Sequence, residues 1–168
     1  MIDKVTIDRI NLLHPKLRDE ALEIYNEAVI ELGDFVTLRF THTLRTIDEQ
    51  NALYAQGRTK PGKIITNAKG GMSFHNYGLA IDIVLLVDRD KNGTHESAVW
   101  DDKADLDKDG KRDWIEVVNI FKQHAWQWGG DWKFYDAPHF QKTFGKSVRE
   151  LLDLYNRGKV DKNGYVLI

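Results

Sequence analysis

The stretch Ser73-Phe74-His75-Asn76-Tyr77-Gly78-Leu79-Ala80-Ile81-Asp82 organises the chain, and a second short stretch, Asp136-Ala137-Pro138-His139-Phe140, complements it. Together they offer two histidines and two carboxylates in a chain that contains no cysteine. A catalytic zinc site commonly takes three nitrogen or oxygen ligands from the protein and leaves a position for water. A nearby carboxylate can then serve as general base. The two stretches therefore contain the residue types that such a site needs.

The run from Leu79 to Val87 is predicted to form a buried strand, because it is short, apolar and rich in branched side chains. Side chains alternate across a strand, so Asp82 should share a face with Val84. A carboxylate in such a strand is costly to bury unless it is paired or bound to a metal. A turn at Gly78 would let His75 fold back toward Asp82. Spacing alone leaves two alternatives open: a surface or core histidine, and an aspartate paired with a buried arginine.

Length and composition set the class of protein. A chain of 168 residues with 42% hydrophobic residues is expected to form a single domain with its own core. A net charge of −2 argues against a strongly basic nucleic-acid surface. The absence of cysteine excludes disulfides and thiolate zinc ligands. We expect no signal peptide and no membrane span, because neither a basic-then-apolar leader nor a long apolar run is present.

The two stretches resemble the metal signature of the M15 zinc peptidases, which comprise D-alanyl-D-alanine carboxypeptidases and the L-alanyl-D-glutamate peptidases of phage endolysins. The shared pattern is Ser-x-His-x-x-Gly-x-Ala-x-Asp followed by Asp-x-Pro-His-Phe, and the similarity runs from about Leu38 to about Phe144. The resemblance implies an α+β fold of the Hedgehog and DD-peptidase type, with helices packed on a small antiparallel sheet. It also implies that residues 1–168 form a single catalytic peptidase domain.

The resemblance assigns roles to individual residues. It implies that zinc is bound by His75, Asp82 and His139, and that Asp136 is the catalytic base. A fourth zinc ligand, or an orienter of His139, is the competing assignment for Asp136.

Two further residues are candidates for the site. Arg45 follows a predicted strand and precedes a predicted helix, where functional loops are common. In the family, an arginine at the matching place holds the substrate or its developing oxyanion; the alternative here is a structural salt bridge. The hydroxyl of Ser73 is expected to hydrogen-bond a zinc ligand or the substrate.

The resemblance implies hydrolysis of peptidoglycan stem peptides by a monomer, without nucleic-acid or membrane partners. The segment Leu53–Thr59 favours the phage L-alanyl-D-glutamate endopeptidases, so we expect an enzyme that stays in the host cytoplasm until a holin releases it. The first alternative is a D-alanyl-D-alanine carboxypeptidase. An alternative from another class is a non-catalytic, calcium-binding protein of the cell wall.

A second motif follows the predicted central strand. Residues 105–116 fit the calcium-loop pattern of the EF-hand. The predicted calcium ligands are the side chains of Asp105, Asp107 and Asp109, the carbonyl of Lys111, Asp113 through water, and Glu116. An apolar stripe that includes Trp114, Val117, Val118, Phe121 and Ala125 predicts the helix that leaves the loop. The alternative is an acidic surface loop that caps a helix. Residues 88–93 begin the same pattern but lack a closing carboxylate, so we predict a turn there, with a weak ion site as the alternative.

The remaining elements follow from periodicity. We predict helices over residues 16–32, 46–56 and 148–155, a strand over 35–40 and a hairpin over 159–168. Residues 134–140 should also be strand-like, with Pro138 limiting them to an edge or irregular piece. Trp126, Trp128 and Trp132 are predicted to fill the core rather than to contact substrate.

Overall fold

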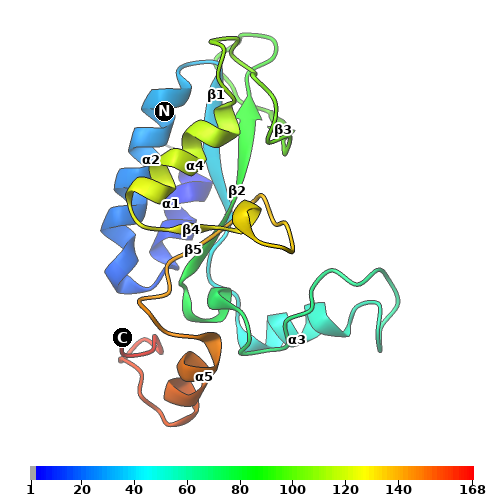
Figure 1. Ribbon diagram of the computed structural model, residues 1–168, viewed down its shortest axis with the longest axis vertical. Helices are drawn as coiled ribbons and strands as arrows, with labels where there is room; N and C mark the ends of the chain where they lie inside the picture. The colour runs from blue at the N-terminus through cyan, green and yellow to red at the C-terminus, as the bar shows by residue number, and fades with distance from the viewer. Residues whose placement is uncertain (1–2) are drawn as a thin grey trace.

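The computed structural model describes residues 3–168 and shows an α+β fold built on an antiparallel sheet (Figure 1). The strands are β1 (Val36–His42), β2 (Ala80–Val87), β3 (Ser97–Val99), β4 (Gln127–Trp128) and β5 (His139–Gln141). The helices are α1 (Lys4–Asn11), α2 (Arg18–Leu32), α3 (Ile47–Ala55), α4 (Asp113–Gln123) and α5 (Val148–Asn156). The 3₁₀ turns are η1 (Pro15–Leu17), η2 (Phe74–Tyr77) and η3 (Gly129–Asp131). The predicted fold class is confirmed.

Strand β2 is the centre of the sheet. It pairs with β1 along one edge and with β5 and β3 along the other, and β4 continues the sheet beyond β5. Ile81, Ile83 and Leu85 are fully buried in the hydrophobic core, which they share with residues of α2 and α4. Because side chains alternate along a strand, Asp82 lies on the opposite face. The candidate functional site lies on this opposite face of the sheet.

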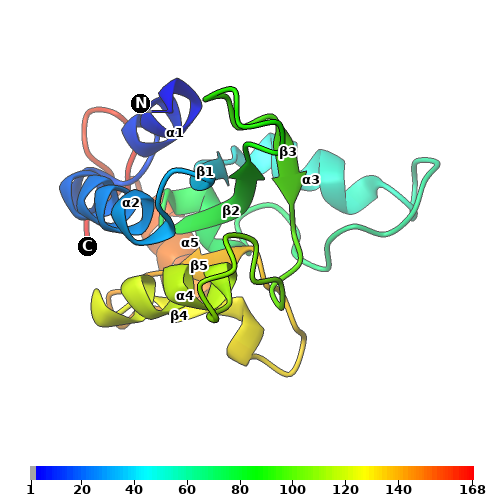
Figure 2. The same ribbon diagram turned by 90° about the horizontal axis from the view of Figure 1, so that it is seen from above.

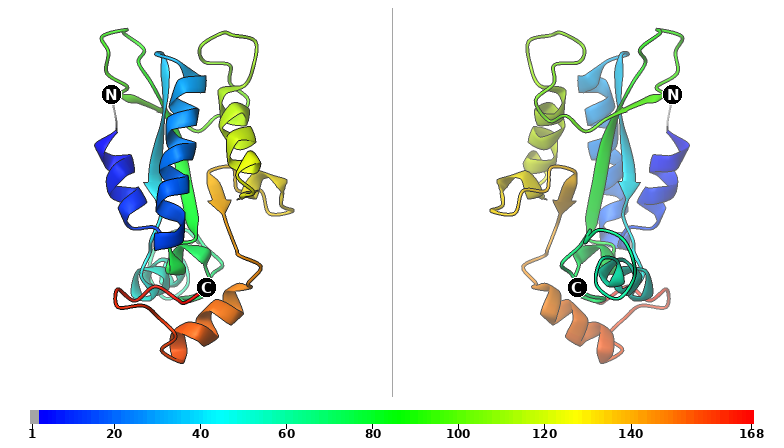
Figure 3. Two further views of the ribbon diagram at one scale, coloured as in Figure 1. Left: turned by 90° about the vertical axis from the view of Figure 1, so that its left-hand side faces the viewer. Right: turned by 90° about the vertical axis from the view of Figure 1, so that its right-hand side faces the viewer.

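Helices α1, α2 and α4 cover the core face. Figure 3 shows α2 and α4 side by side along the strands, and α1 and α2 both contact β1. The predicted end of α2 at Gly33 is confirmed, since this glycine has a φ of +67° that a side chain would strain. The apolar stripe of α4 is buried as predicted, except for Ala125. That residue lies beyond the helix with a φ of +59° and is exposed, so its assignment to the stripe was wrong.

Helix α3 and the loop that follows it extend away from the rest of the fold (Figure 2). The predicted capping box is present: the Thr46 hydroxyl accepts a hydrogen bond from Glu49 N, and Glu49 accepts one from Thr46 N. The helix therefore starts where its sequence specifies, directly after the segment that contains Arg45.

The predicted strand over residues 134–140 is too long, because only His139–Gln141 forms β5. Phe134, Tyr135 and Asp136 are exposed and lie in a loop after η3. Pro138 has no N–H to give to a sheet, but its carbonyl accepts a hydrogen bond from Ile83 N at 3.1 Å. Pairing with β2 therefore begins only at this proline.

The C-terminal part closes the end of the molecule that lies opposite the β2–β3 loop (Figure 1). After α5 the chain turns, with an antiparallel bridge between Val160 and Val166 as the hairpin prediction required. The Val166 carbonyl lies 2.9 Å from Nε2 of His14, which ties the tail to the junction between α1 and α2. Within residues 3–168, no helix is both long and apolar enough to cross a membrane.

Candidate metal centre

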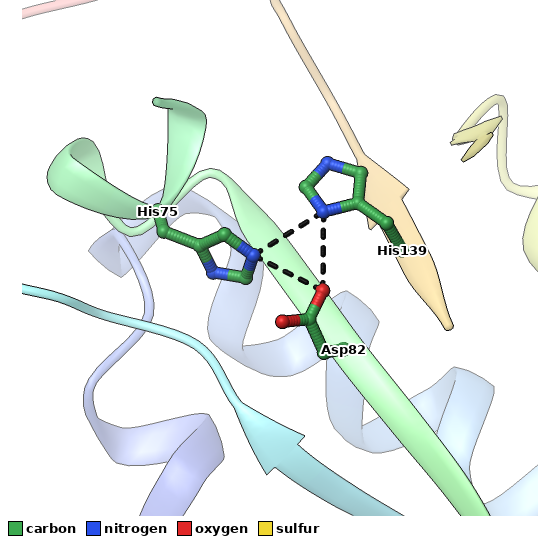
Figure 4. A group of neighbouring side chains, drawn as sticks. All are labelled: His75, Asp82 and His139. Carbon is green, nitrogen blue, oxygen red and sulfur yellow. Dashed lines mark hydrogen bonds and ion pairs between the residues drawn. The ribbon is translucent and has the colours of Figure 1, made fainter. Parts of the chain in front are cut away.

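His75, Asp82 and His139 meet in one cluster, although the two histidines are 64 residues apart in the sequence (Figure 4). The Asp82 Oδ1 atom lies 3.1 Å from His75 Nε2 and 3.1 Å from His139 Nδ1, and the two ring nitrogens are 3.2 Å apart. Ligand atoms about 2.0–2.1 Å from a tetrahedral ion would lie about 3.3 Å from one another. The separations therefore fit one face of a zinc site.

The sheet register brings two of these residues together. Asp82 on β2 lies directly opposite His139 on β5, and directly opposed residues project to the same face. On its other side Asp82 pairs with His42 of β1, after an irregularity that begins at Phe40. The carboxylate thus stands on the middle one of three strands, with a histidine on each neighbour.

The third residue arrives on the 3₁₀ turn η2. The Ser73 hydroxyl accepts a hydrogen bond from His75 N at 3.3 Å and so caps this turn. Gly78 ends it with a φ of +66°, and a Cβ there would lie 2.7 Å from His14 N. Only glycine fits this reversal. The predicted fold-back at Gly78 is therefore present, and Ser73 hydrogen-bonds the backbone of His75.

Each imidazole has its outer nitrogen held by an acceptor. His75 Nδ1 lies 2.7 Å from the Thr43 carbonyl, and His139 Nε2 lies 3.1 Å from Gln141 Oε1. Gln141 in turn donates to Gln127 Oε1 at 2.9 Å. An acceptor beside each outer nitrogen favours the tautomers whose ring protons lie there, and in these tautomers two lone pairs and a carboxylate oxygen face one another. Three converging acceptors need a cation between them, and zinc suits this set of nitrogen and oxygen donors.

The charges of the cluster agree with that need. Burial opposes ionisation of Asp82, but His75 and His139 outweigh it and lower the pKa of this carboxyl below its usual range. Burial also disfavours protonation of His139, yet the Asp82 carboxylate raises its pKa above the ordinary value. The site therefore stabilises positive charge beside Asp82.

Asp136 lines the same cleft as the three residues and is exposed in it. Partial desolvation raises the pKa of Asp136, an effect that His139 opposes and Asp82 reinforces. Among the described residues no hydrogen bond joins the Asp136 carboxylate to His139; the contact that orients this imidazole comes from Gln141.

Two tryptophans fix the backbone beside Asp136. The indole N–H groups of Trp114 and Trp128 both donate to the Ala137 carbonyl, at 3.3 Å and 2.7 Å. Both rings are buried, and so is Trp126, as predicted. Trp132 differs: it is 37% exposed and lines the cleft with its ring centroid 5.2 Å from that of His139. The prediction that it fills the core was wrong.

Arg45 also lines the cleft. Its Nη1 donates to Gln50 Oε1 at 3.0 Å, while its Nε is buried and has no hydrogen-bond partner. No salt bridge of Arg45 is found within residues 3–168, so the structural alternative for this arginine has no support there. The Arg45 side chain is therefore held by a neutral partner, and its Nε–H group has no hydrogen-bond acceptor.

These residues surround a cleft of about 610 Å³ between the sheet and the segment that follows α3. Sequence analysis did not identify Gln141 as part of this site. The available signal was its position two residues after His139, which puts both side chains on one face of β5. His42 also lines the cleft, with its ring centroid 6.2 Å from that of His75.

The predicted calcium ligands lie elsewhere, at the start of α4. The carboxylates of Asp105, Asp107 and Asp109 come within 4.8 Å of one another, and Asp113 and Glu116 are buried beside them.

Comparison with known proteins shows what this chain resembles. The family model described as D-alanyl-D-alanine carboxypeptidase, of the M15 peptidases, matches residues 66–142. The peptidoglycan L-alanyl-D-glutamate endopeptidase CwlK of Bacillus subtilis is 45% identical over 130 residues, which are 77% of this chain and 72% of that protein. The crystal structure of the L-Ala D-Glu endopeptidase ChiX of Serratia marcescens has a TM-score of 0.54 at 18% identity, covering 85% of this chain and 90% of that chain. This last likeness concerns the fold alone.

Proposed function

The chain belongs to the M15 family of metallopeptidases, and from this premise we propose that it is a zinc-dependent endopeptidase that hydrolyses the L-alanyl-D-glutamate bond of peptidoglycan stem peptides. The observation that carries the proposal is the convergence of two imidazole lone pairs and one carboxylate oxygen, each outer ring nitrogen being held by a neighbour. The similarity to a Bacillus subtilis enzyme named for this cleavage supports the choice of bond.

His75, Asp82 and His139 would hold the zinc ion. When bound, zinc supplies Lewis acidity, which polarises a carbonyl and lowers the pKa of water. The residues of the chain do the rest. Asp136 accepts the proton of the attacking water on its carboxylate and passes it to the leaving amine. Its raised pKa suits both halves of this transfer. Arg45, whose side chain lines the cleft, stabilises the negative charge that develops on the carbonyl oxygen.

The test of this proposal is a digestion of purified muropeptides by the zinc-loaded protein, followed by mass spectrometry of the products. The proposal expects a released peptide that begins with a free amino group on D-glutamate. Asp136→Asn should lower kcat by about 10²–10⁴-fold while zinc content stays at one equivalent. Asp131→Asn is the matched control, because Asp131 is an exposed carboxylate of the same segment that pairs with Lys122 instead. Full activity of Asp136→Asn would show that Asp136 is not the general base.

A second candidate function is a D-alanyl-D-alanine carboxypeptidase, which the description of the matching family model favours. The same digestion separates the two, since release of free D-alanine would identify the carboxypeptidase. The third hypothesis, a non-catalytic calcium-binding wall protein, conflicts with membership of a metallopeptidase family.

For the biological setting we propose lysis of a bacterial host by a phage-type enzyme that reaches the wall through a holin. The proposal rests on the resemblance of residues 53–59 to phage endopeptidases. Expression of the protein in a host with and without a holin tests it. Lysis that needs no holin would contradict this setting and leave the chemistry unaffected.

A further inference from the structure

The loop between β3 and α4 gathers acidic side chains outside the candidate metal centre. Asp105, Asp107 and Asp109 bring one carboxylate oxygen each within 4.8 Å of one another. Hydrogen bonds within the loop fold it, such as those from Gly110 N to Asp105 and from Lys111 N to Asp109. Acidic turns of many kinds make such contacts, so these alone do not indicate a ligand.

Two buried carboxylates at the end of the loop provide a separate observation. Asp113 is 0% exposed, and its Oδ2 accepts a hydrogen bond across the loop from Leu106 N at 2.7 Å, while its Oδ1 has no partner. Glu116 is 7% exposed, and its Oε2 has no partner. A buried carboxylate oxygen without a partner is costly. Within residues 3–168 only four buried side-chain atoms lack a partner, and these are two of them.

A single positive group now bridges two positions of the loop. Lys111 Nζ lies 3.0 Å from Glu116 Oε1 and 3.4 Å from Asp109 Oδ2. It also contacts Glu31 of α2 at 3.3 Å, and the lysine side chain is 59% exposed. Because this ammonium is on a long exposed side chain, it can leave when a stronger cation arrives. The carboxylates of Asp109 and Glu116 are thus already arranged around a positive charge.

The neighbouring loop over residues 88–96 shows what a satisfied acidic turn looks like. Asp88 is 6% exposed, but its Oδ1 accepts from Asn92 N at 3.0 Å and its Oδ2 from Gly93 N at 2.8 Å. Each oxygen thus has a backbone N–H donor, although the carboxylates of Asp88, Asp90 and Glu96 also come within 4.8 Å of one another. Of the two loops, only the one before α4 has buried carboxylate oxygens without a hydrogen-bond donor.

We propose that residues 105–116 bind one calcium ion. The site would use the carboxylates of Asp105, Asp107, Asp109, Asp113 and Glu116, with the Lys111 carbonyl as a further oxygen ligand. Calcium takes six to eight oxygen ligands, and this loop has the spacing and the glycine that such sites use. Zinc prefers the nitrogen donors of the other centre. On binding, calcium replaces the Lys111 ammonium and partners the buried oxygens of Asp113 and Glu116.

Calcium titration of the zinc-loaded protein by calorimetry tests the proposal, after removal of other divalent ions on a chelating resin. We expect one equivalent of calcium with a Kd tighter than about 1 mM. At calcium about 100-fold above that Kd, the melting temperature should rise by about 5–10 °C. Asp105→Asn and Glu116→Gln should each weaken binding by at least about tenfold. Asp90→Asn, in the satisfied loop, is the matched control and should bind as the parent does.

Lys111→Met gives a variant whose effect has the opposite sign. The lysine would ligate through its backbone, so its side chain competes with the ion and its removal should tighten calcium binding several-fold. Lys108→Met, which removes another lysine of the loop, is the control for charge alone. Absence of binding heat and of a melting shift at about 5 mM calcium would overturn the proposal. Loss of binding in Asp90→Asn rather than Glu116→Gln would overturn it as well. These outcomes do not depend on peptidase activity.

Discussion

The candidate metal centre and the acidic loop over residues 105–116 both gather ion-binding side chains, but they are held in opposite ways. At the metal centre the ligands come from distant segments, and each ring is fixed from outside, as His139 is by Gln141. In the acidic loop the side chains are close in sequence and accept hydrogen bonds from backbone N–H groups of the same loop. The first site is therefore preorganised by the fold, whereas the second is bridged by one exposed lysine, Lys111.

Because the two regions are held differently, substitutions in them should affect different properties of the protein. Damage to the metal centre should remove activity with little loss of fold, because the sheet beneath it is independently packed. Damage to the acidic loop should change calcium affinity and stability, because the loop begins α4, whose Trp114 supports the Ala137 carbonyl next to Asp136.

The strongest test removes a metal ligand. His139→Ala should abolish zinc binding and lower peptidase activity by about 10³-fold or more, since the Lewis acid is lost with its ligand. Metal content by elemental analysis and the muropeptide digestion measure the two effects. Calcium binding should not change. His124→Gln is the control, because that histidine pairs with Glu20 and Glu27 away from the cleft. Zinc retained at full affinity in His139→Ala would exclude this residue as a ligand.

A smaller effect is expected from the residue that orients this ligand. Gln141→Ala removes the acceptor of His139 Nε2–H and should weaken zinc affinity by about 10–100-fold. Gln141→Glu should restore much of it, because a carboxylate accepts the same proton. Competition with a zinc chelator measures the affinity. At saturating zinc, kcat should be close to that of the parent; a fall in kcat with unchanged zinc affinity would refute the positioning role.

The hydrogen bonds that hold the Ala137 carbonyl, next to Asp136, connect the candidate metal centre to α4 and the acidic loop before it. Trp128→Phe keeps an aromatic ring but removes the 2.7 Å hydrogen bond to the Ala137 carbonyl, leaving Trp114 as its only indole donor. The free energy of unfolding should fall by about 1 kcal/mol. Urea denaturation measures this, and kcat should fall a few-fold while zinc content is unchanged. A loss of zinc together with the hydrogen bond would show that the turn positions His139 and not only Asp136.

The smallest effect is expected from Asp3, a carboxylate that lies outside both regions. Burial opposes ionisation of Asp3, but hydrogen bonds and ion pairing with Arg39 lower the pKa of Asp3 from its usual 3.8. Its contribution to stability is therefore present above pH 3.8 and is lost as the pH falls through the lower pKa of the folded state. Asp3→Asn keeps an N-cap side chain but removes the charge that pairs with Arg39, so it should lower the free energy of unfolding by about 1 kcal/mol at neutral pH.

Urea denaturation at a series of pH values measures this difference. It should disappear at strongly acidic pH, where the parent has lost the same charge. A difference that persists there would assign the effect to the shape of the side chain and not to its charge.

The sequence was sufficient for the parts that are local or strongly patterned. The strand that contains Asp82, the capped start of α3 and the turn at Gly78 all follow from nearby residues, and all are present. The convergence of His75 with His139 was expected from motif resemblance, and the sheet register supplies its physical cause.

The parts that sequence analysis missed depend on contacts between distant segments. Gln141 becomes an orienting residue only once β5 has paired with β2, and its position two residues after His139 was a weak local signal. Trp132 is aromatic like its buried neighbours, but η3 turns it into the cleft. The strand prediction over residues 134–140 failed for a related reason: pairing requires a partner, and β2 offers one only from Pro138 onward.

The pairing of β2 with β5 also determines when during synthesis the three side chains of the cluster can meet. His139 follows Asp82 by 57 positions, so a nascent chain cannot assemble the cluster until β5 has left the ribosome. A fragment that stops before β5 would contain His75 and Asp82 without their third partner.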